Sequence, residues 1–453
     1  MRASLRRELR PMVSLAVPVI LAEIGWTTMG LVDTLMVGPL GPAAIGAVGL
    51  GSIVFLAIGI FGMGLLLGLD TLIAQSFGAG RLDQCRHWLR QGVYLALISA
   101  VPLSLISFGV TASLPSWGLD AEVLALASPY LNVVTLSVAP LLLYAAFRRY
   151  LQAVNLVRPI TFALLSANLV NVAVNWVLIY GKLGFPALGA TGAAWATVLS
   201  RVYMAAVLLV AIRAAGRGRA AAAAGTRRVD GAALRRLLAL GGPAGLQILL
   251  EVGVFATATA LAGRLAPASL AAHQIAMNLW AFVFMVPLGL NAAGAVRVGQ
   301  AVGRRDRDGA SRAGWTALAL AAGFTASSAV VFLVAARPLI GAFSQDGTVL
   351  AIGPSLLAIA GVCLVFDGTQ GVSTGILRGL GETRIPMAAN FAGHWLIGLP
   401  LGYAACFWWG WGVQGLWFGL AAGLTAVGSA LLVTWSRRVR RALPDAPQSG
   451  PTP

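Results

Sequence analysis

Long apolar stretches, separated by short segments rich in arginine and glycine, fill almost the whole chain between Leu15 and Trp435. A membrane-spanning helix needs about 20 apolar residues to cross roughly 30 Å of hydrocarbon. The pattern therefore predicts an all-α integral membrane protein with twelve transmembrane helices. The predicted helices begin near Pro11, Ala43, Gly92, Val123, Pro159, Gly189, Gly241, Ala271, Ala313, Leu350, Pro386 and Gly415.

The composition agrees with this pattern and excludes an ordinary soluble domain. Hydrophobic residues make up 58% of the 453 residues and charged residues only 10%, and the mean hydropathy is +0.84. Soluble globular domains are much less apolar and carry more charge. The lipid bilayer is thus the first expected partner of this chain.

Arginine is distributed unevenly between the two sets of loops that twelve crossings create. Of the 32 lysines and arginines, 27 fall in the termini and loops of one side, whereas the other side has only Lys182, Arg264 and Arg337. Arg201 and Arg297 fall inside predicted helices. Cytoplasmic loops carry the excess of basic residues in membrane proteins. We therefore expect a multi-pass protein of the bacterial cytoplasmic (inner) membrane, with both termini in the cytoplasm.

The formal net charge of +17 does not indicate a nucleic-acid partner. The arginines are spread over every cytoplasmic loop without the interleaved aromatic residues of a nucleic-acid surface, and contact with anionic lipid headgroups explains them better. The three cysteines are scattered and form neither a metal-binding spacing nor a disulfide framework. A monomer without a resident cofactor is expected.

The second half of the chain repeats the first. One constant offset in the numbering aligns Pro18 with Pro243, Gly38 with Gly263, Gln75 with Gln300 and Gly78 with Gly303. Each predicted helix of the first half has its copy six helices later in the chain. Because six is an even number, a helix and its copy cross the membrane in the same direction. The sequence therefore predicts two six-helix lobes that are parallel repeats of one another.

The repeat also predicts the boundaries of the domains. The N-lobe, with helices 1–6, spans positions 1–212, and a cytoplasmic linker spans positions 213–236. The C-lobe, with helices 7–12, spans positions 237–441, and a disordered cytoplasmic tail spans positions 442–453. Two six-helix lobes with a cavity between them are the architecture of alternating access. A duplicated channel is the alternative, but the acidic residues of the two halves do not align with one another.

Five acidic residues interrupt the apolar stretches, namely Glu23, Asp33, Asp70, Glu251 and Asp367. A charged side chain near the bilayer centre costs roughly 2.5–3.5 kcal/mol on insertion scales, and such residues usually bind or move a cation. Asp70 approaches the end of its helix, where capping or pairing with an arginine is favoured. For Glu23 a structural role and a functional one are weighed evenly.

Asp33 is the strongest candidate of the first lobe. Asn168, Asn171 and Asn175 follow one face of a single predicted helix, and Thr197 on the next helix can add a hydroxyl. A carboxylate with amides suits Na⁺, which prefers oxygen ligands, and equally suits an aspartate that takes up a proton. Amides that merely join neighbouring helices are the alternative.

Glu251 and Asp367 are the candidates of the second lobe, because each lies inside an apolar helix without a basic partner on that helix. A coupling ion, Na⁺ or H⁺, is therefore expected at Asp33 or at Glu251 with Asp367. The residue types suit both ions, and the choice between them stays open.

Three aromatic or flexible side chains of one helix, Trp280, Phe282 and Met285, are candidates for a hydrophobic substrate cavity. Packing is the commoner role for such residues. His273, at the start of the same helix, is a secondary candidate for proton exchange, and a structural histidine with satisfied hydrogen bonds is the alternative.

Five strings carry a resemblance to a known family. They are Asp33-Thr-Leu-Met-Val-Gly38, Gly68-Leu-Asp-Thr-Leu-Ile-Ala-Gln75-Ser-Phe-Gly-Ala-Gly80, Ala271-Ala-His-Gln-Ile275, Arg297-Val-Gly-Gln-Ala-Val-Gly303 and Gly375-Ile-Leu-Arg378-Gly379. In this order and at these spacings, the chain resembles the multidrug and toxic compound extrusion (MATE) family over nearly its whole length, and within it the bacterial NorM-like branch. Members are twelve-helix antiporters that expel cationic, amphipathic compounds in exchange for Na⁺ or H⁺.

Carried over position by position, the resemblance implies a cation site at Asp33 with Asn171 and Asn175. The helix 7 glutamate and helix 10 aspartate of the NorM-like branch match the two acids of the second lobe. That branch often has an aromatic hydroxyl one turn before this aspartate, where the present chain has Cys363.

The expected function is a secondary active antiporter that exports cationic, amphipathic drugs or toxic organic compounds in exchange for Na⁺ or H⁺ by alternating access. The alternative is a flippase of lipid-linked sugars or other amphiphiles in the same superfamily, which should place several arginines in its cavity. An intramembrane aspartyl protease needs Tyr-Asp and Gly-x-Gly-Asp, whereas the chain has Phe366-Asp367 and Gly68-Leu-Asp70. No phosphate-binding loop for ATP occurs in the sequence, and no enzymatic activity is expected.

Overall fold

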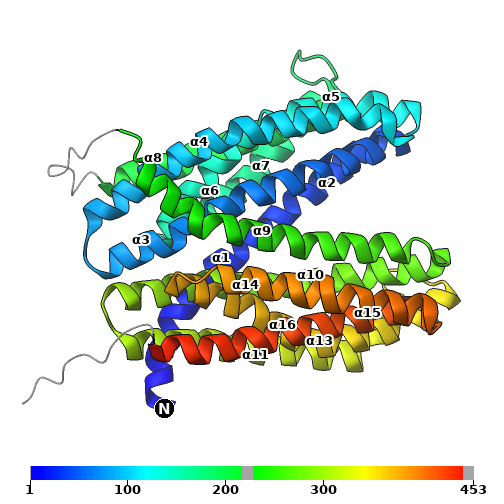
Figure 1. Ribbon diagram of the computed structural model, residues 1–453. Coiled ribbons are helices and arrows are strands. Elements are labelled where there is room, and N and C mark those ends of the chain that lie inside the picture. Colours follow the sequence, from blue (N-terminus) through cyan, green and yellow to red (C-terminus); the bar gives the residue numbers. More distant parts are fainter. Residues whose placement is uncertain (1, 217–227, 442–453) are drawn as a thin grey trace, which may run out of the picture. The chain divides into compact units, whose positions relative to one another are not determined.

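The computed structural model describes residues 2–216 and 228–441, and within these ranges every regular element is a helix. Figure 1 shows long helices running side by side within each part of the chain. Residues 217–227 of the predicted linker and the whole predicted tail at 442–453 lie outside the described residues.

The first half of the chain forms eight α-helices. Their bounds are α1 Arg2–Val37, α2 Pro42–Leu65, α3 Gly68–Gly78, α4 Leu82–Ser113, α5 Ala121–Thr135, α6 Val138–Ala153, α7 Arg158–Tyr180 and α8 Ala190–Gly216. Short 3₁₀ helices, η1 at Gly38–Leu40 and η2 at Leu114–Trp117, follow α1 and α4.

The second half begins with α9. Its elements are α9 Gly231–Ala262, α10 Pro267–Gly303, α11 Arg307–Val334, α12 Ala336–Gly341, α13 Gly347–Leu380, α14 Arg384–Asn390, η4 Phe391–Gly398, α15 Leu399–Tyr403, η5 Ala404–Trp408 and α16 Gly412–Arg441. Aspartate caps the N-terminus of both α5 and α13. The Asp120 carboxylate accepts hydrogen bonds from the backbone N–H groups of residues 122 and 123, and the Asp346 carboxylate accepts from the backbone N–H groups of residues 348 and 349.

Ten helical stretches in the described residues are long and apolar enough to cross a membrane, with α2 and α3 counted as one. An eleventh is the pair of α5 and α6, which meet at a bend of 45°. The one remaining predicted crossing, which begins near Pro386, corresponds to residues 384–408, which are helical throughout but pass through the π-helical segments η4 and η5. Counted in this way, the predicted twelve-helix membrane protein is confirmed.

The helices pack into two compact units that differ from the predicted lobes. Among the described residues, unit 1 comprises residues 2–20, 74–80 and 246–441, and unit 2 comprises residues 21–73, 81–216 and 228–245. The N-terminal part of α1 therefore packs with the second half of the chain. Parts of the predicted linker are helical as well, because α8 continues to Gly216 and α9 starts at Gly231. The lobe boundaries drawn from the sequence stay a prediction.

The internal repeat reappears as a reciprocal contact inside unit 1. A Cβ atom on Gly78 would lie 2.0 Å from the carbonyl oxygen of Gln300, and a Cβ atom on Gly303 would lie 2.0 Å from that of Gln75. The offset of the repeat aligns Gly78 with Gly303 and Gln75 with Gln300, so the two contacts are copies of one another. Only glycine permits the two backbones to approach this closely.

Candidate functional site

Asp33 lies at the centre of a buried polar cluster in unit 2, built from α1, α7 and α8. One oxygen of the carboxylate accepts a hydrogen bond from Nδ2 of Asn175 at 2.7 Å, and the other accepts from the Thr197 hydroxyl at 2.9 Å. The same Asn175 amide also donates to Oδ1 of Asn171 at 3.1 Å. Asn171 and Asn175 are one turn apart on α7 and share a face of the helix, so Oδ1 of Asn171 holds the Asn175 amide that reaches the carboxylate. The structure thus brings together four of the residues that the sequence singled out.

The cluster keeps unused hydrogen-bonding capacity. Asn171 and Asn175 are fully buried and Asp33 is 6% exposed, yet Nδ2 of Asn171 and Oδ1 of Asn175 have no partner among the described residues. A buried polar atom without a partner is rare in native proteins and indicates a bound water, an ion or a ligand. Amide and carboxylate oxygens are ligands that a hard cation prefers, and Asn175 and Asp33 supply one of each kind.

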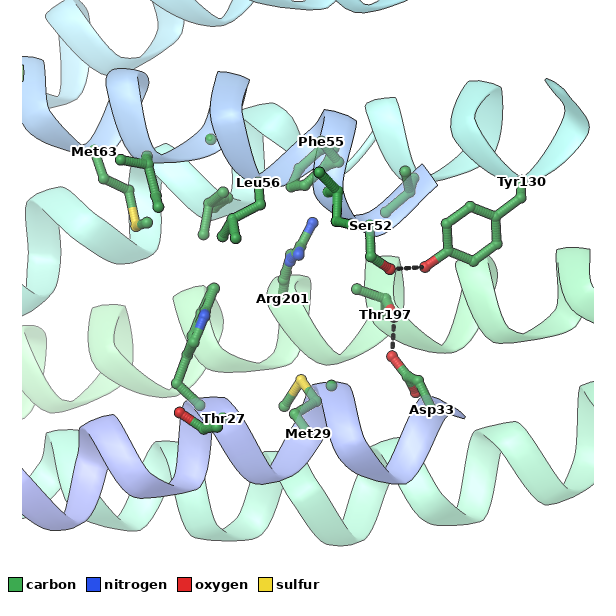
Figure 2. A pocket seen from close by; sticks show the side chains of 17 residues that line it. Thr27, Met29, Asp33, Ser52, Phe55, Leu56, Met63, Tyr130, Thr197 and Arg201 are labelled. Carbon is green, nitrogen blue, oxygen red and sulfur yellow. Dashed lines mark hydrogen bonds between the residues drawn. The ribbon is translucent and has the colours of Figure 1, made fainter. Parts of the chain in front are cut away.

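Beside this cluster lies a cavity of about 340 Å³, which we call the Asp33 cavity. Figure 2 shows Asp33 and Thr197 joined on one side of it and Ser52 and Tyr130 joined on the other, where their hydroxyls are 3.1 Å apart. Most of the remaining lining is apolar, with Trp26 and Phe55 as aromatic walls. The volume falls within the range of small-molecule pockets, which are typically apolar with a few placed polar groups.

Arg201 is a member of this cavity that the sequence analysis did not select. Its guanidinium donates to the Ser137 hydroxyl and lies over the ring of Phe55, 4.3 Å from the ring centroid. Such a desolvated cation–π contact is worth up to about 2 kcal/mol. The available signal was its spacing, because Arg201 follows Thr197 by one helical turn and therefore shares its face of α8.

A second acidic cluster forms in unit 1 between α9, α13 and α14. Oε1 of Glu251 accepts from Nε2 of Gln370 at 3.2 Å, and Oε2 accepts from Nδ2 of Asn390 at 3.4 Å. Asp367 lies on the same helix as Gln370 and interacts electrostatically with Glu251. The structure therefore brings together Glu251 and Asp367, and it adds two amides that the sequence analysis had not selected.

Asp367 is 1% exposed, and neither oxygen of its carboxylate has a hydrogen-bond partner in the described part of the chain. One further oxygen without a partner belongs to each of Gln370, Ser373 and Asn390. Both ring nitrogens of the buried His394 also lack a partner. This concentration of unpaired polar atoms inside an apolar unit is costly without a bound proton, ion or water.

Other intramembrane acids have arginine partners. Glu23 on α1 pairs with Arg148 on α6, and Asp70 on α3 pairs with Arg149 at 3.3 Å. In unit 1, both carboxylate oxygens of Glu8 accept from the guanidinium of Arg297, with a shortest distance of 2.7 Å. Glu23 and Asp70 are thus held in interhelical ion pairs.

Two secondary candidates, Asn168 and His273, make structural contacts. Asn168 donates to the backbone carbonyls of Gly25 and Leu164 and so joins α7 to α1. His273 accepts from the Trp417 indole N–H at Nδ1, and its Nε2 lies 3.0 Å from the Thr259 hydroxyl. Because an indole can only donate, these two contacts describe a neutral histidine with its proton on Nε2.

The remaining candidates lie around the hydrophobic core of unit 1. Cys363 and Trp280 are buried members of one apolar cluster, in which Trp280 packs edge-on against Phe255 with ring centroids 4.6 Å apart. Met285 is partly buried, whereas Phe282 is 67% exposed. A substrate cavity at these residues stays a prediction, and the observed contacts of Trp280 are those of a core residue.

Comparison with known proteins agrees with this architecture. A family model described as MatE matches residues 18–177 and again residues 243–404, so both halves of the chain match the same model. The chain is 36% identical over 449 residues to the "Probable multidrug resistance protein NorM" of Mesorhizobium japonicum, covering 97% of this chain and 96% of the relative. It is 31% identical over 437 residues to the "Multidrug resistance protein NorM" of Aliivibrio fischeri, covering 95% and 94% of the two chains.

A solved structure described as "Outward-facing conformation of a multidrug resistance MATE family transporter of the MOP superfamily" superposes with a TM-score of 0.87 at 20% identity, covering 96% of both chains. At this identity the likeness concerns the fold, and it supports the layout of twelve helices in two lobes. The relatives above 30% identity span nearly the whole chain, and the family model matches more than half of it. The chain therefore belongs to the MATE family, in its NorM-like branch, and is a membrane transporter and not an enzyme.

Proposed function

We propose that this chain is a secondary active antiporter that exports cationic, amphipathic organic compounds in exchange for Na⁺ or H⁺ by alternating access. The relatives named as multidrug resistance proteins support export of small organic compounds. The arginine-rich loops support a place in the bacterial cytoplasmic membrane, with both termini in the cytoplasm.

One observation carries the proposal, namely the division of the buried acids into two groups. Glu23 and Asp70 are each paired with an arginine. Asp33, Glu251 and Asp367 form no ion pair within 4 Å in the described residues, although all three lie inside helices that can cross a membrane. A buried acid that no arginine or lysine contacts directly inside a membrane favours a proton or a mobile cation as its partner.

The two clusters suit different ligands. Asp33 lines a cavity of about 340 Å³, which has room for part of an organic cation beside the carboxylate. Asp367 is almost fully buried next to Glu251, and two neighbouring carboxylates resist being charged together unless a proton or Na⁺ lies between them. We therefore assign the organic cation to Asp33, with Asn171 and Asn175, and the coupling ion to Glu251 and Asp367.

The test uses purified protein in lipid vesicles and a fluorescent organic cation. Efflux should follow an imposed Na⁺ gradient or an imposed H⁺ gradient, and the effective gradient identifies the coupling ion. Asp367→Asn should abolish gradient-driven efflux but still exchange substrate for substrate, whereas Asp33→Asn should lose both activities. Glu122→Gln, at an exposed acid in the first turn of α5, is the matched control. Efflux at the same rate with and without either gradient would contradict the proposed antiporter mechanism.

A further inference from the structure

We propose that His394 passes protons from the external side of the membrane to the acids Glu251 and Asp367, and that it is a proton-transfer residue of the acidic cluster in unit 1. The inference rests on the proposed function and deepens it, because it names H⁺ as the ion that these acids exchange. It follows from the hydrogen bonds that His394 lacks and from the two helices that place it near Glu251.

His394 is a buried polar side chain without a hydrogen bond in the described part of the chain. It is fully buried, and neither Nδ1 nor Nε2 has a partner there. The other buried histidine, His273, contacts Trp417 through one ring nitrogen and Thr259 through the other. Burying an unpaired polar atom is costly, and a phenylalanine ring would fill the same space without this cost. Packing alone therefore does not explain the imidazole.

Two helices place His394 near Glu251. Asn390 donates to Oε2 of Glu251 at 3.4 Å, and His394 follows Asn390 by four residues. On α9, Phe255 follows Glu251 by four residues, and its ring centroid lies 6.2 Å from that of His394. Helical residues at this spacing share a face of the helix. The imidazole therefore lies about one turn beyond the Glu251 carboxylate along both helices.

The segment that carries His394 is fixed against α9. The indole N–H of Trp395, the next residue, donates to the backbone carbonyl of Leu250 at 3.0 Å, directly before Glu251. This segment, η4, is π-helical from Phe391 to Gly398, a rare conformation that is frequent at functional sites. The position of the imidazole relative to the acid is thus set by contacts on both sides of the histidine.

The titratable groups on the surrounding helices are mainly acids. Glu251 on α9 and Asp367 on α13 form the cluster itself, and Cys363 precedes Asp367 by one turn. On α15, Tyr403 packs against aromatic rings of η5. The arginines of α9, α14 and α16 stand at the ends of these helices that the proposed orientation places in the cytoplasm.

One water molecule fits between the imidazole and the acids. A helical turn rises about 5.4 Å, and two consecutive hydrogen bonds of about 2.8 Å each span about the same distance. A buried water needs two to four polar partners. Both carboxylate oxygens of Asp367 and Oδ1 of Asn390 have no partner among the described residues and can supply them.

The direction of the path suits proton entry from outside. On the proposed orientation, α9 and residues 384–408 both start at the cytoplasmic side, so Phe255 and His394 lie on the external side of Glu251. A hydronium ion protonates one ring nitrogen of His394, and the other ring nitrogen releases its proton through the water to a carboxylate. One N–H bond forms and one breaks, the carboxylate becomes a carboxylic acid, and a half-turn of the neutral ring restores the starting tautomer.

The experiment follows efflux of a fluorescent organic cation and the uptake of protons together, using vesicles with a pH-sensitive dye inside. His394→Gln keeps hydrogen bonding but takes up no proton, and His394→Phe keeps the ring. In both, proton-driven efflux and proton uptake should fall about tenfold or more, whereas substrate-for-substrate exchange without a gradient should keep the wild-type rate. The remaining proton uptake should be slowed more by D₂O than in the wild type. His87→Gln, a partly exposed histidine beside Asp230, should change none of these rates.

Each outcome decides the proposal. Loss of proton-driven efflux with intact exchange, in either His394 variant, supports it. Wild-type coupling in both variants overturns it, and so does equal loss of efflux and exchange, or failure of both variants to fold, because these results make His394 structural. Efflux by the wild-type protein that follows a Na⁺ gradient but not an H⁺ gradient overturns the inference and leaves the proposed function intact. Efflux that follows neither gradient contradicts the proposed function itself.

Discussion

Removing the charge of a buried acid should lower stability at Glu23 but not at Asp367. Glu23→Gln leaves the guanidinium of Arg148 without its carboxylate, and the two side chains are only 17% and 9% exposed. Breaking a buried pair by removing one partner costs about 3–5 kcal/mol. Because Glu23 keeps some exposure, we expect a loss near the lower end, about 3 kcal/mol, which corresponds to roughly a hundredfold in the folding equilibrium.

Asp367→Asn should behave differently. The carboxylate of Asp367 has no hydrogen-bond partner among the described residues, and no arginine loses an ion pair when its charge is removed. An amide of the same shape lowers the cost of burying the group. We therefore expect the free energy of unfolding to stay within about 1 kcal/mol of the wild-type value or to rise.

The assay is equilibrium unfolding in mixed detergent micelles with increasing sodium dodecyl sulfate, followed by the fluorescence of the 13 tryptophans. Glu122→Gln, an exposed acid in the first turn of α5, is the control and should be neutral. Equal losses of stability in Glu23→Gln and Asp367→Asn would refute the division of the buried acids into structural and functional groups.

Three further predictions follow from particular contacts. Gly78→Ala should lower the melting temperature in thermal unfolding, because its Cβ would lie 2.0 Å from a backbone oxygen. Gly49→Ala, whose Cβ would meet nothing within 4 Å, should leave the melting temperature unchanged or raise it. Equal effects of the two substitutions would contradict the close approach at Gly78. Asn175→Ala should abolish efflux while the protein is still expressed at the wild-type level, whereas Asn168→Ala should mainly lower the melting temperature. The reverse result would contradict the assignment of Asn175 to the site and of Asn168 to the contact between helices. Reporter fusions after Arg236 and at the C-terminus should both report cytoplasm, and an external signal at either would contradict the proposed orientation.

Much of the architecture could be predicted because it depends on patterns within single segments of the sequence. Twelve apolar stretches of sufficient length predict twelve helices, and a constant offset between matching residues, such as Gly78 and Gly303, predicts the repeat. The Asp33 cluster was also accessible, since two asparagines at a spacing of four must share a helix face. The bend between α5 and α6 and the π-helical segments of residues 384–408 were not accessible, because neither has a distinct hydrophobic period.

The contacts of the acids could not be predicted, because they depend on which helices become neighbours. Glu23 looks like Asp33 in the sequence, and only packing against α6 gives it Arg148 as a partner. For Asp70, capping or pairing with an arginine was expected, but the sequence did not indicate that the partner would be Arg149. Arg201 was noted as an arginine inside a helix, but its place in a cavity is set by residues on α1 and α2. The packing units were missed for the same reason, since a single long helix such as α9 contributes to both.

The central claim is that Glu251 and Asp367, two acids without arginine partners, couple transport to an ion gradient. Uphill transport tests it most directly: vesicles are loaded with equal substrate inside and outside, the coupling gradient is applied, and the substrate ratio across the membrane is followed over time. The wild-type protein should build and hold an unequal ratio, whereas Asp367→Asn should leave the ratio at one while still exchanging labelled for unlabelled substrate. An Asp367→Asn protein that builds the same ratio as the wild type would contradict the account.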